Sequence, residues 1–384
     1  MDLLEVLESG WNGFNAVNER KKPANYDRAL KETIDLLTNK KGYSTRRRAA
    51  LIEEAMTTSD FPYLFGDVLD RTMLASYQAV NPVWKMYTKS STVSRIYPQV
   101  GAYRFQMGDG DQYLAEVGQK GEYLASKRSE TRYSIYVKKY GRQFDISWES
   151  IINDDLGALL DTPQRFARAA ARTEHRLAVA AYAADIGTHG AGNLYENAVN
   201  MGNLDLTIGN LEISVANMRK FTDVNGEPIM SGAKYLVVPP DLEFTARAIL
   251  TSATKMYTAE SIDVDGTIYS TPYPTANVVA QLGLTLVVDP YLPIMDTTYG
   301  TKAWYLFADP NDVAAVECDY LTGHERPEIC MKASDKVAVG GGGLITPMSG
   351  DFATDNIMYR VRDVFGANKL DWRGTYANFP GYGQ

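Results

Sequence analysis

Residues 161–185 have the sequence DTPQRFARAAARTEHRLAVAAYAAD, and this stretch holds the clearest predicted helix of the chain. Asp161 and Thr162 suit an N-cap and Pro163 suits the first helical position, so we predict a helix over residues 163–185. At 1.5 Å per residue it spans roughly 34 Å. One face is mostly alanine, which lets a sheet or another helix approach closely. That face holds Phe166, Ala169, Ala170, Thr173, Leu177, Ala180, Ala181 and Ala184.

Alternating apolar and polar residues upstream predict a long β-hairpin over residues 92–139. The apolar positions are Tyr103, Phe105 and Met107 before a Gly-Asp-Gly-Asp turn at residues 108–111, and Tyr113, Ala115 and Val117 after it. Such alternation creates one apolar face, and a hairpin of this kind is marginal in water alone. We therefore expect it to lie on another surface, for which a neighbouring molecule is a candidate.

Strands and helices alternate after residue 200, which predicts a mixed α/β lobe. One predicted helix contains Ile208, Leu211, Val215 and Met218, and a second begins at Pro239 and Pro240. The predicted strands are Tyr235–Val238, Leu284–Val288 and Ala303–Ala308. Strand patterns return at Ile357–Val364 and Leu370–Trp372. A chain of 384 residues exceeds the size of one hydrophobic core, so two lobes are expected.

Residues 1–57 predict short helices with narrow apolar stripes, including Asn25–Lys40 and Thr45–Met56. These helices are too thin to form a core by themselves, so we expect them to lie against another body. The basic run Arg46–Arg48 has two interpretations. It is either a solvated face or a contact with an acidic neighbour or nucleic acid.

The composition is that of a globular protein, with 45% hydrophobic and 22% charged residues. A net charge of −8 argues against tight DNA binding by the whole surface. The 25 tyrosines suit either contact surfaces or strands. Two cysteines fit a reducing cytoplasm, and we expect neither a signal peptide nor a membrane span.

Motifs for catalysis and metal binding are weak. The histidines His175, His189 and His324 form no zinc-protease pattern, and neither a nucleophile elbow nor a phosphate-binding loop is recognisable. The acidic turns at residues 223–226 and 263–266 lack the glutamate that closes a calcium loop. We therefore expect no catalytic residue, no cofactor and no metal.

Several segments, taken in order, resemble the major capsid proteins of tailed phages with the Hong Kong 97-like fold, in the branch of the Mu-type major head subunit. The resemblance covers about residue 55 to the end. It rests on Thr58–Phe65, Tyr140–Glu149 followed by Ile151–Leu156, Leu236–Glu243, Trp304–Pro310, Arg360–Ala367 and Asp371–Gly374.

The resemblance implies an α+β fold of five parts. These are an N-terminal arm (1–91), an extended loop (92–139), a peripheral domain with a long spine helix (140–199), an axial α/β domain (200–322) and return strands of the peripheral domain (323–384). It also implies self-assembly into pentamers and hexamers of an icosahedral virion shell around double-stranded DNA, in the cytoplasm of a bacterial host. Portal, scaffolding or decoration proteins are implied partners, and a membrane is not.

The expected subunit-interface residues are Tyr103, Phe105, Met107, Asp109, Gly110, Tyr113, Lys120, Arg46, Arg47 and Arg48. One alternative is an encapsulin-like cellular nanocompartment shell, which the sequence barely distinguishes from a phage shell. A further alternative is an enzyme that uses acids such as Asp154, Asp155 or Glu325, but the sequence indicates no substrate for it.

Overall fold

The computed structural model describes most of the chain after residue 60 and short stretches before it. The described residues are 26–37, 41–44, 61–80, 82–96, 99–102, 132–147, 156–183, 194–195, 199–223, 226–229, 231–262, 268–332, 334–336 and 351–382, with residues 47, 50, 51, 116, 117 and 123 as single positions.

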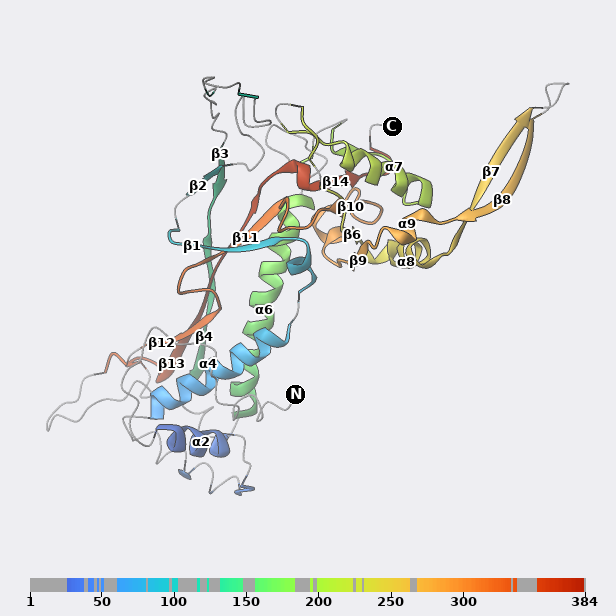
Figure 1. Ribbon diagram of the computed structural model, residues 1–384. Coiled ribbons are helices and arrows are strands. Elements are labelled where there is room, and N and C mark those ends of the chain that lie inside the picture. The colour runs from blue at the N-terminus through green and yellow to red at the C-terminus, as the bar shows by residue number, and fades with distance from the viewer. Residues whose placement is uncertain are drawn as a thin grey trace.

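A first sheet is organised around one long strand (Figure 1). Its strands are β1 (Lys89–Val93), β4 (Lys138–Ser147), β11 (Val316–Leu321), β12 (Glu328–Met331) and β13 (Asn356–Lys369). The long strand β13 pairs antiparallel with β4 along one edge, and with β12 and β11 one after the other along the opposite edge. The strand β1 adds to β11 in parallel register.

Helices cover this sheet. The longest is α6 (Leu156–Ala183), with 28 residues, and α4 (Phe61–Ala79) crosses it, while α2 (Tyr26–Leu37) lies beyond α4 (Figure 1). The predicted start of the long helix at Pro163 is wrong, because the helix begins seven residues earlier and runs through this buried proline. Leu156, Ala158 and Leu159 favour helix, and Pro163 removes only one backbone hydrogen bond.

A second sheet has the order β5-β14-β10-β6-β9. Its strands are β5 (Met201–Gly202), β6 (Tyr235–Val238), β9 (Thr285–Val288), β10 (Trp304–Phe307) and β14 (Thr375–Asn378). Helices α7 (Ile208–Arg219), α8 (Glu243–Thr251), α9 (Val278–Gln281) and α10 (Leu292–Met295) accompany it, with short 3-10 turns at Val83–Met86, Pro240–Leu242 and Trp372–Gly374. The predicted strand at Leu370–Trp372 is wrong, because Trp372 begins one of these turns.

One aromatic core joins the two sheets. Tyr182 near the end of α6 packs edge-on against Tyr305 and Phe307 of β10, at centroid distances of 5.2 and 5.1 Å. Trp84 packs against Phe365 of the first sheet at 5.7 Å. A second cluster lies within the second sheet and its helices, and it includes Leu211, Val215, Leu236, Ile249, Trp304 and Leu306. The shared core fixes the sheets relative to each other.

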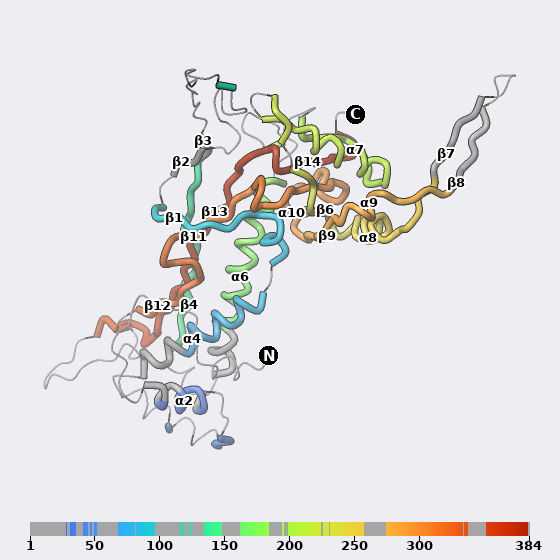
Figure 2. Tube along the Cα trace, in the orientation of Figure 1, coloured from blue at the N-terminus to red at the C-terminus, as the bar shows by residue number. Residues whose placement is uncertain are grey.

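The strand pairing refines the expected division into parts, which we keep as a proposal. Strand β11, expected in the axial domain, belongs to the first sheet, whereas β14, expected among the return strands of the peripheral domain, belongs to the second. Figure 2 shows the chain running along β13 through the first sheet and then on to β14 in the second. The chain therefore passes between the two sheets more often than the residue ranges suggested.

A β-hairpin extends from the part of the molecule that contains the second sheet (Figure 1). The sequence patterns did not predict it. Its strands are β7 (Thr254–Ile262) and β8 (Ile268–Ala276), paired antiparallel from Thr254 opposite Ala276 to Ile262 opposite Ile268. The Asp-Gly pair at residues 265–266, between two strand-like runs, was the available signal. From the sequence, residues 263–266 were interpreted only as an acidic turn that lacks the closing glutamate of a calcium loop.

Candidate functional site

Nine of the ten predicted interface residues lie outside the described residues. These nine are Tyr103, Phe105, Met107, Asp109, Gly110, Tyr113, Lys120, Arg46 and Arg48. The tenth, Arg47, is exposed, and its guanidinium carbon lies 5.4 Å from the ring centroid of Tyr43. The structure therefore describes the base of the predicted extended loop, while the loop's contact residues stay a prediction.

The base of that loop is a short two-stranded ladder. Strands β2 (Gln99–Ala102) and β3 (Arg132–Ile135) pair antiparallel, with Gln99 opposite Ile135 and Ala102 opposite Arg132. Beyond the ladder, toward the sheet, Val137 is buried together with Val93 and Val364. Antiparallel pairing therefore occurs at the base of the region 92–139, while the predicted turn at residues 108–111 lies outside the described residues.

Asn368 of β13 fastens this base to the first sheet. Its side-chain Nδ2 donates to the carbonyl oxygen of Tyr136 at 3.1 Å, and its Oδ1 accepts from the Tyr136 backbone N–H at 3.3 Å. The same Nδ2 also donates to Asp319 at 2.8 Å. Gly366, two residues before Asn368, lies against the carbonyl of Tyr136, where a Cβ would clash. These contacts hold the start of the loop at one place on the sheet.

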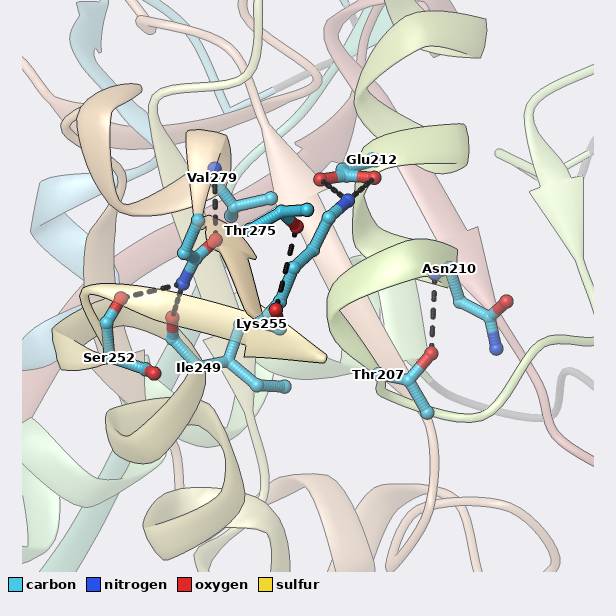
Figure 3. A network of polar contacts seen from close by, with 9 residues as sticks. Thr207, Asn210, Glu212, Ile249, Ser252, Lys255, Thr275 and Val279 are labelled. Carbon is cyan, nitrogen blue, oxygen red and sulfur yellow. Dashed lines mark hydrogen bonds and ion pairs between the residues drawn. The ribbon is translucent and has the colours of Figure 1, made fainter. Parts of the chain in front are cut away.

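The base of the second hairpin, β7–β8, is fastened on two sides (Figure 3). Lys255 Nζ reaches across to Glu212 of α7, at 2.6 and 2.7 Å from its two carboxylate oxygens. Asn277 directly follows β8, and its side-chain Nδ2 donates to the carbonyl oxygens of Ile249 and Ser252 at 2.7 and 2.9 Å. Its Oδ1 accepts from the backbone N–H of Val279 and so caps α9. Because Asn277 is buried, these bonds are shielded from water.

Buried carboxylates lie between α6 and the first sheet. Glu174 is 1% exposed and accepts hydrogen bonds from the hydroxyls of Tyr77 at 2.5 Å and Tyr320 at 3.2 Å. Burial, and then the negative charge of Asp363, raise the pKa of Glu174 to about 8. Burial likewise raises the pKa of Asp363, whose carboxylate oxygens have no hydrogen-bond partner, to about 6. Glu174 therefore holds a proton at neutral pH and joins α4, α6 and β11.

A second buried acid, Asp289, joins α6 to the second sheet. It accepts from the Tyr87 hydroxyl at 3.0 Å and from the backbone N–H of Tyr291 at 2.9 Å, and His175 Nε2 lies 2.9 Å from its Oδ2. Asp289 thus contacts residues of three separate segments of the chain. The histidine inside the long helix is thus part of the packing between the lobes.

His324 lies in a charged cluster on the first sheet. Its Nδ1 is 2.5 Å from Glu328, and Glu328 also accepts from Arg362 at 2.6 Å. Burial opposes ionisation of Glu328, but the hydrogen bonds from Arg362 and His324 outweigh it and lower its pKa. His189 and the pair Asp154–Asp155 lie outside the described residues, and Glu325 accepts a hydrogen bond from the backbone N–H of Gly323.

The described residues contain neither a metal-binding cluster nor a membrane-spanning helix. No three His, Cys, Asp or Glu side chains in this part of the chain come together as a metal ion would require. Among the same residues, none of the helices has the length and hydropathy for crossing a bilayer. Two hairpin bases, β2–β3 and β7–β8, are each fastened to the body of the protein by side-chain hydrogen bonds.

Comparison with known proteins identifies the class of protein to which this chain belongs. A family model described as phage capsid protein matches residues 131–378, more than half of the chain. Anchored hairpins on an α+β body, together with this match, define a viral structural protein. The chain belongs to the phage capsid protein family. The predictions of a phage capsid protein, of a virion component and of a function other than catalysis are thereby confirmed, and the mixture of helices and sheets agrees with the predicted α+β fold class.

Solved structures with a similar fold come from several sources. One from Gordonia phage Cozz is 13% identical, with a TM-score of 0.44, and the match covers 78% of this chain and 87% of that one. One from Mycobacterium phage Ogopogo is 12% identical, with a TM-score of 0.41 and coverages of 78% and 91%. An encapsulin from Synechococcus elongatus is 10% identical, with a TM-score of 0.43 and coverages of 80% and 94%. No curated protein matches the chain.

Proposed function

We propose that the chain is the major capsid protein of a tailed phage, and that its pentamers and hexamers form an icosahedral shell around double-stranded DNA. As a capsid protein it associates with further copies of itself. The proposal extends this to the oligomeric states, to assembly in the host cytoplasm, and to portal, scaffolding or decoration proteins as partners. The five-part division, with β11 and β14 reassigned by their sheets, belongs to the same proposal.

The observation that supports the proposal best is the pair of fixed hairpin bases, β2–β3 and β7–β8. The extended loop starts from the ladder that Asn368 fastens, and β7–β8 starts from the contacts of Lys255 and Asn277. An isolated two-stranded hairpin is marginally stable in water. A protein that anchors two of them firmly therefore presents them to a partner, and in a shell that partner is the neighbouring subunit.

The predicted contact residues of the extended loop give the first test. Tyr103→Asp combined with Phe105→Asp should leave the subunit folded and prevent particles, because a charge buried without a partner in an interface is strongly unfavourable. Phe352→Asp is the control, since Phe352 is 82% exposed and lies outside both hairpins. Circular dichroism reports folding and negative-stain electron microscopy reports particles. If the double variant failed to fold, the loop would belong to the subunit's own core.

The second hairpin allows a shortened variant. Replacing residues 257–273 by a two-residue Asn-Gly turn joins Met256 to Pro274, which are paired across the strands, and keeps the anchors Lys255 and Asn277. The variant should fold normally and assemble poorly. Normal particles from it would show that β7–β8 has no part in subunit contacts.

The contents of the particles separate a phage shell from a nanocompartment. Particles formed in the presence of a packaging system should take up double-stranded DNA. Particles that exclude DNA and retain a protein cargo would instead favour the encapsulin-like alternative. A chain that stays monomeric at every concentration and salt would contradict both.

A further inference from the structure

Helix α6 carries a row of arginines on the side away from the core. Arg165, Arg168, Arg172 and Arg176 follow one another at spacings of three, four and four residues, and all four side chains are exposed. With 3.6 residues per turn they fall within an arc of about 80° on the helical wheel. The buried residues Ala167, Ala170, Glu174 and Ala178 occupy the opposite arc. We call the exposed row the arginine face.

Acidic residues on α6 leave three members of the arginine face, Arg168, Arg172 and Arg176, without a nearby negative charge. Asp161 precedes Arg165 by four residues, and Glu174 is buried on the other side of the helix and protonated at neutral pH. Neighbouring like charges at a spacing of four residues weaken a helix. A row of this kind is therefore unfavourable for the isolated subunit, unless something negative covers it.

Other arginines of the described chain have acidic partners. Arg28 pairs with Glu32, and Arg247 pairs with Glu243, each four residues apart on a helix. By contrast, no ion pair within the described residues joins Arg168, Arg172 or Arg176 to a carboxylate.

The row is held rigidly. Glu174, between Arg172 and Arg176 in the sequence, is bonded to Tyr77 of α4 and Tyr320 of β11. The next residue, His175, is bonded to Asp289. From Arg165 to Arg176 the helix rises by roughly 16 Å. Double-stranded DNA carries about one phosphate charge per 1.7 Å of its axis, so this length faces roughly ten phosphates.

We propose that the arginine face contacts the phosphate backbone of packaged double-stranded DNA, an inference that rests on the proposed shell function. Guanidinium groups bind phosphate oxygens in bidentate fashion. A protein partner fits less well, because protein interfaces concentrate aromatic and apolar anchors and the exposed Ala169 between the arginines offers none. Contacts to phosphates alone are independent of base sequence. The net charge of −8 keeps the rest of the surface from binding DNA.

The salt dependence of DNA binding tests this proposal. The purified full-length chain and a variant with Arg168→Gln, Arg172→Gln and Arg176→Gln are titrated against a random-sequence DNA duplex at several salt concentrations. Losing three phosphate contacts should reduce the slope of log affinity against log salt by about 2.7. Between roughly 50 and 200 mM salt, the wild-type chain should then lose about 40-fold more affinity than the variant.

A control variant carries the same change of charge elsewhere. Arg28→Gln, Arg247→Gln and Lys302→Gln alter three exposed side chains away from the arginine face, and this variant should keep the wild-type slope. Equal loss of slope in both variants would show an effect of net charge and overturn the proposal. Should the arginine variant fold poorly, Arg172→Gln alone should reduce the slope by about 0.9.

Electron microscopy of the same preparations separates this proposal from the shell function. Particles from the arginine variant with an unchanged DNA slope would overturn the arginine face and leave the shell intact. Loss of particles with an unchanged slope would assign the face to an acidic protein surface, which also overturns the proposal. If the wild type formed no particles at any salt, the shell function would fail, while the slopes would still decide whether the arginine face binds DNA.

Discussion

Replacing Glu174 by glutamine should flatten the pH dependence of subunit stability between pH 6 and pH 9. Glu174 is 1% exposed, and its pKa rises from 4.5 to about 8 in the folded chain because burial and Asp363 disfavour its charge. A folded-state pKa above the unfolded one means that folding takes up a proton. The stabilising contribution is complete below the ordinary glutamate pKa and is lost as pH rises through about 8.

The size of the effect follows from the two pKa values. Each unit of difference corresponds to about 1.4 kcal/mol, so the whole shift corresponds to roughly 5 kcal/mol. By pH 6 part of this is already lost, and roughly 3 kcal/mol remains to be lost between pH 6 and pH 9. Asp363, with its pKa raised to about 6, titrates mostly below this window. The difference between wild type and Glu174→Gln therefore reports mainly the titration of Glu174 together with its effect on Asp363.

The assay is urea unfolding of the unassembled full-length chain at pH 6, 7, 8 and 9, followed by circular dichroism. Sedimentation at each pH confirms that the state of association is unchanged. Glutamine keeps the shape of the side chain and still accepts from the Tyr77 hydroxyl, so the variant should fold. Glu116→Gln is the matched control, because Glu116 is exposed and should leave the wild-type slope unchanged.

Two results would refute the reasoning. One is a wild-type free energy of unfolding that does not fall between pH 6 and pH 9. The other is a free energy of unfolding of the Glu174→Gln variant that falls as steeply with pH as that of the wild type, which would place the titrating group elsewhere.

Further substitutions probe the bases of the two hairpins. Gly366→Ala places a Cβ against the Tyr136 carbonyl and should destabilise the subunit by roughly 2–3 kcal/mol in thermal unfolding. The control Gly209→Ala, which has open space around it in α7, should be neutral or stabilising. Equal effects of the two substitutions would contradict the contact between Gly366 and Tyr136. Asn277→Ala removes three buried hydrogen bonds and should cost roughly 2–3 kcal/mol, with hydrogen exchange increasing first in β7 and β8. Lys255→Ala breaks a partly exposed ion pair and should cost less than about 1 kcal/mol, and a larger loss in urea unfolding would show that this pair dominates the anchor.

Local patterns predicted much of the secondary structure. The strand Tyr235–Val238 was predicted to the residue, and the apolar face of the helix with Leu211, Val215 and Met218 was predicted correctly, because apolar spacing and flanking prolines specify such elements locally. The start of α6 was missed by seven residues, since Pro163 is a strong local signal that packing overrides. The β7–β8 hairpin was missed because its prolines and charges weaken the strand pattern.

The sequence could not predict the contacts that define the candidate site. Asn368 and Tyr136 are 232 positions apart, and Tyr87 and Asp289 are 202 apart, so no local pattern relates them. The protonated state of Glu174 depends on burial under α4 and on Asp363 of β13, and both come from distant parts of the chain.

By itself, the sequence determined the periodic elements, the charge balance and the absence of recognisable catalytic motifs, because these depend on neighbours along the chain. Only the tertiary structure decided which sheet received β11 and β14, which asparagines fastened the hairpins, and which side of α6 faced outward. The physical reason is that burial and hydrogen bonding between distant segments set these features. The alanine face expected from the sequence includes Ala169, which is exposed beside the arginines, while Ala167 and Glu174 turn to the core.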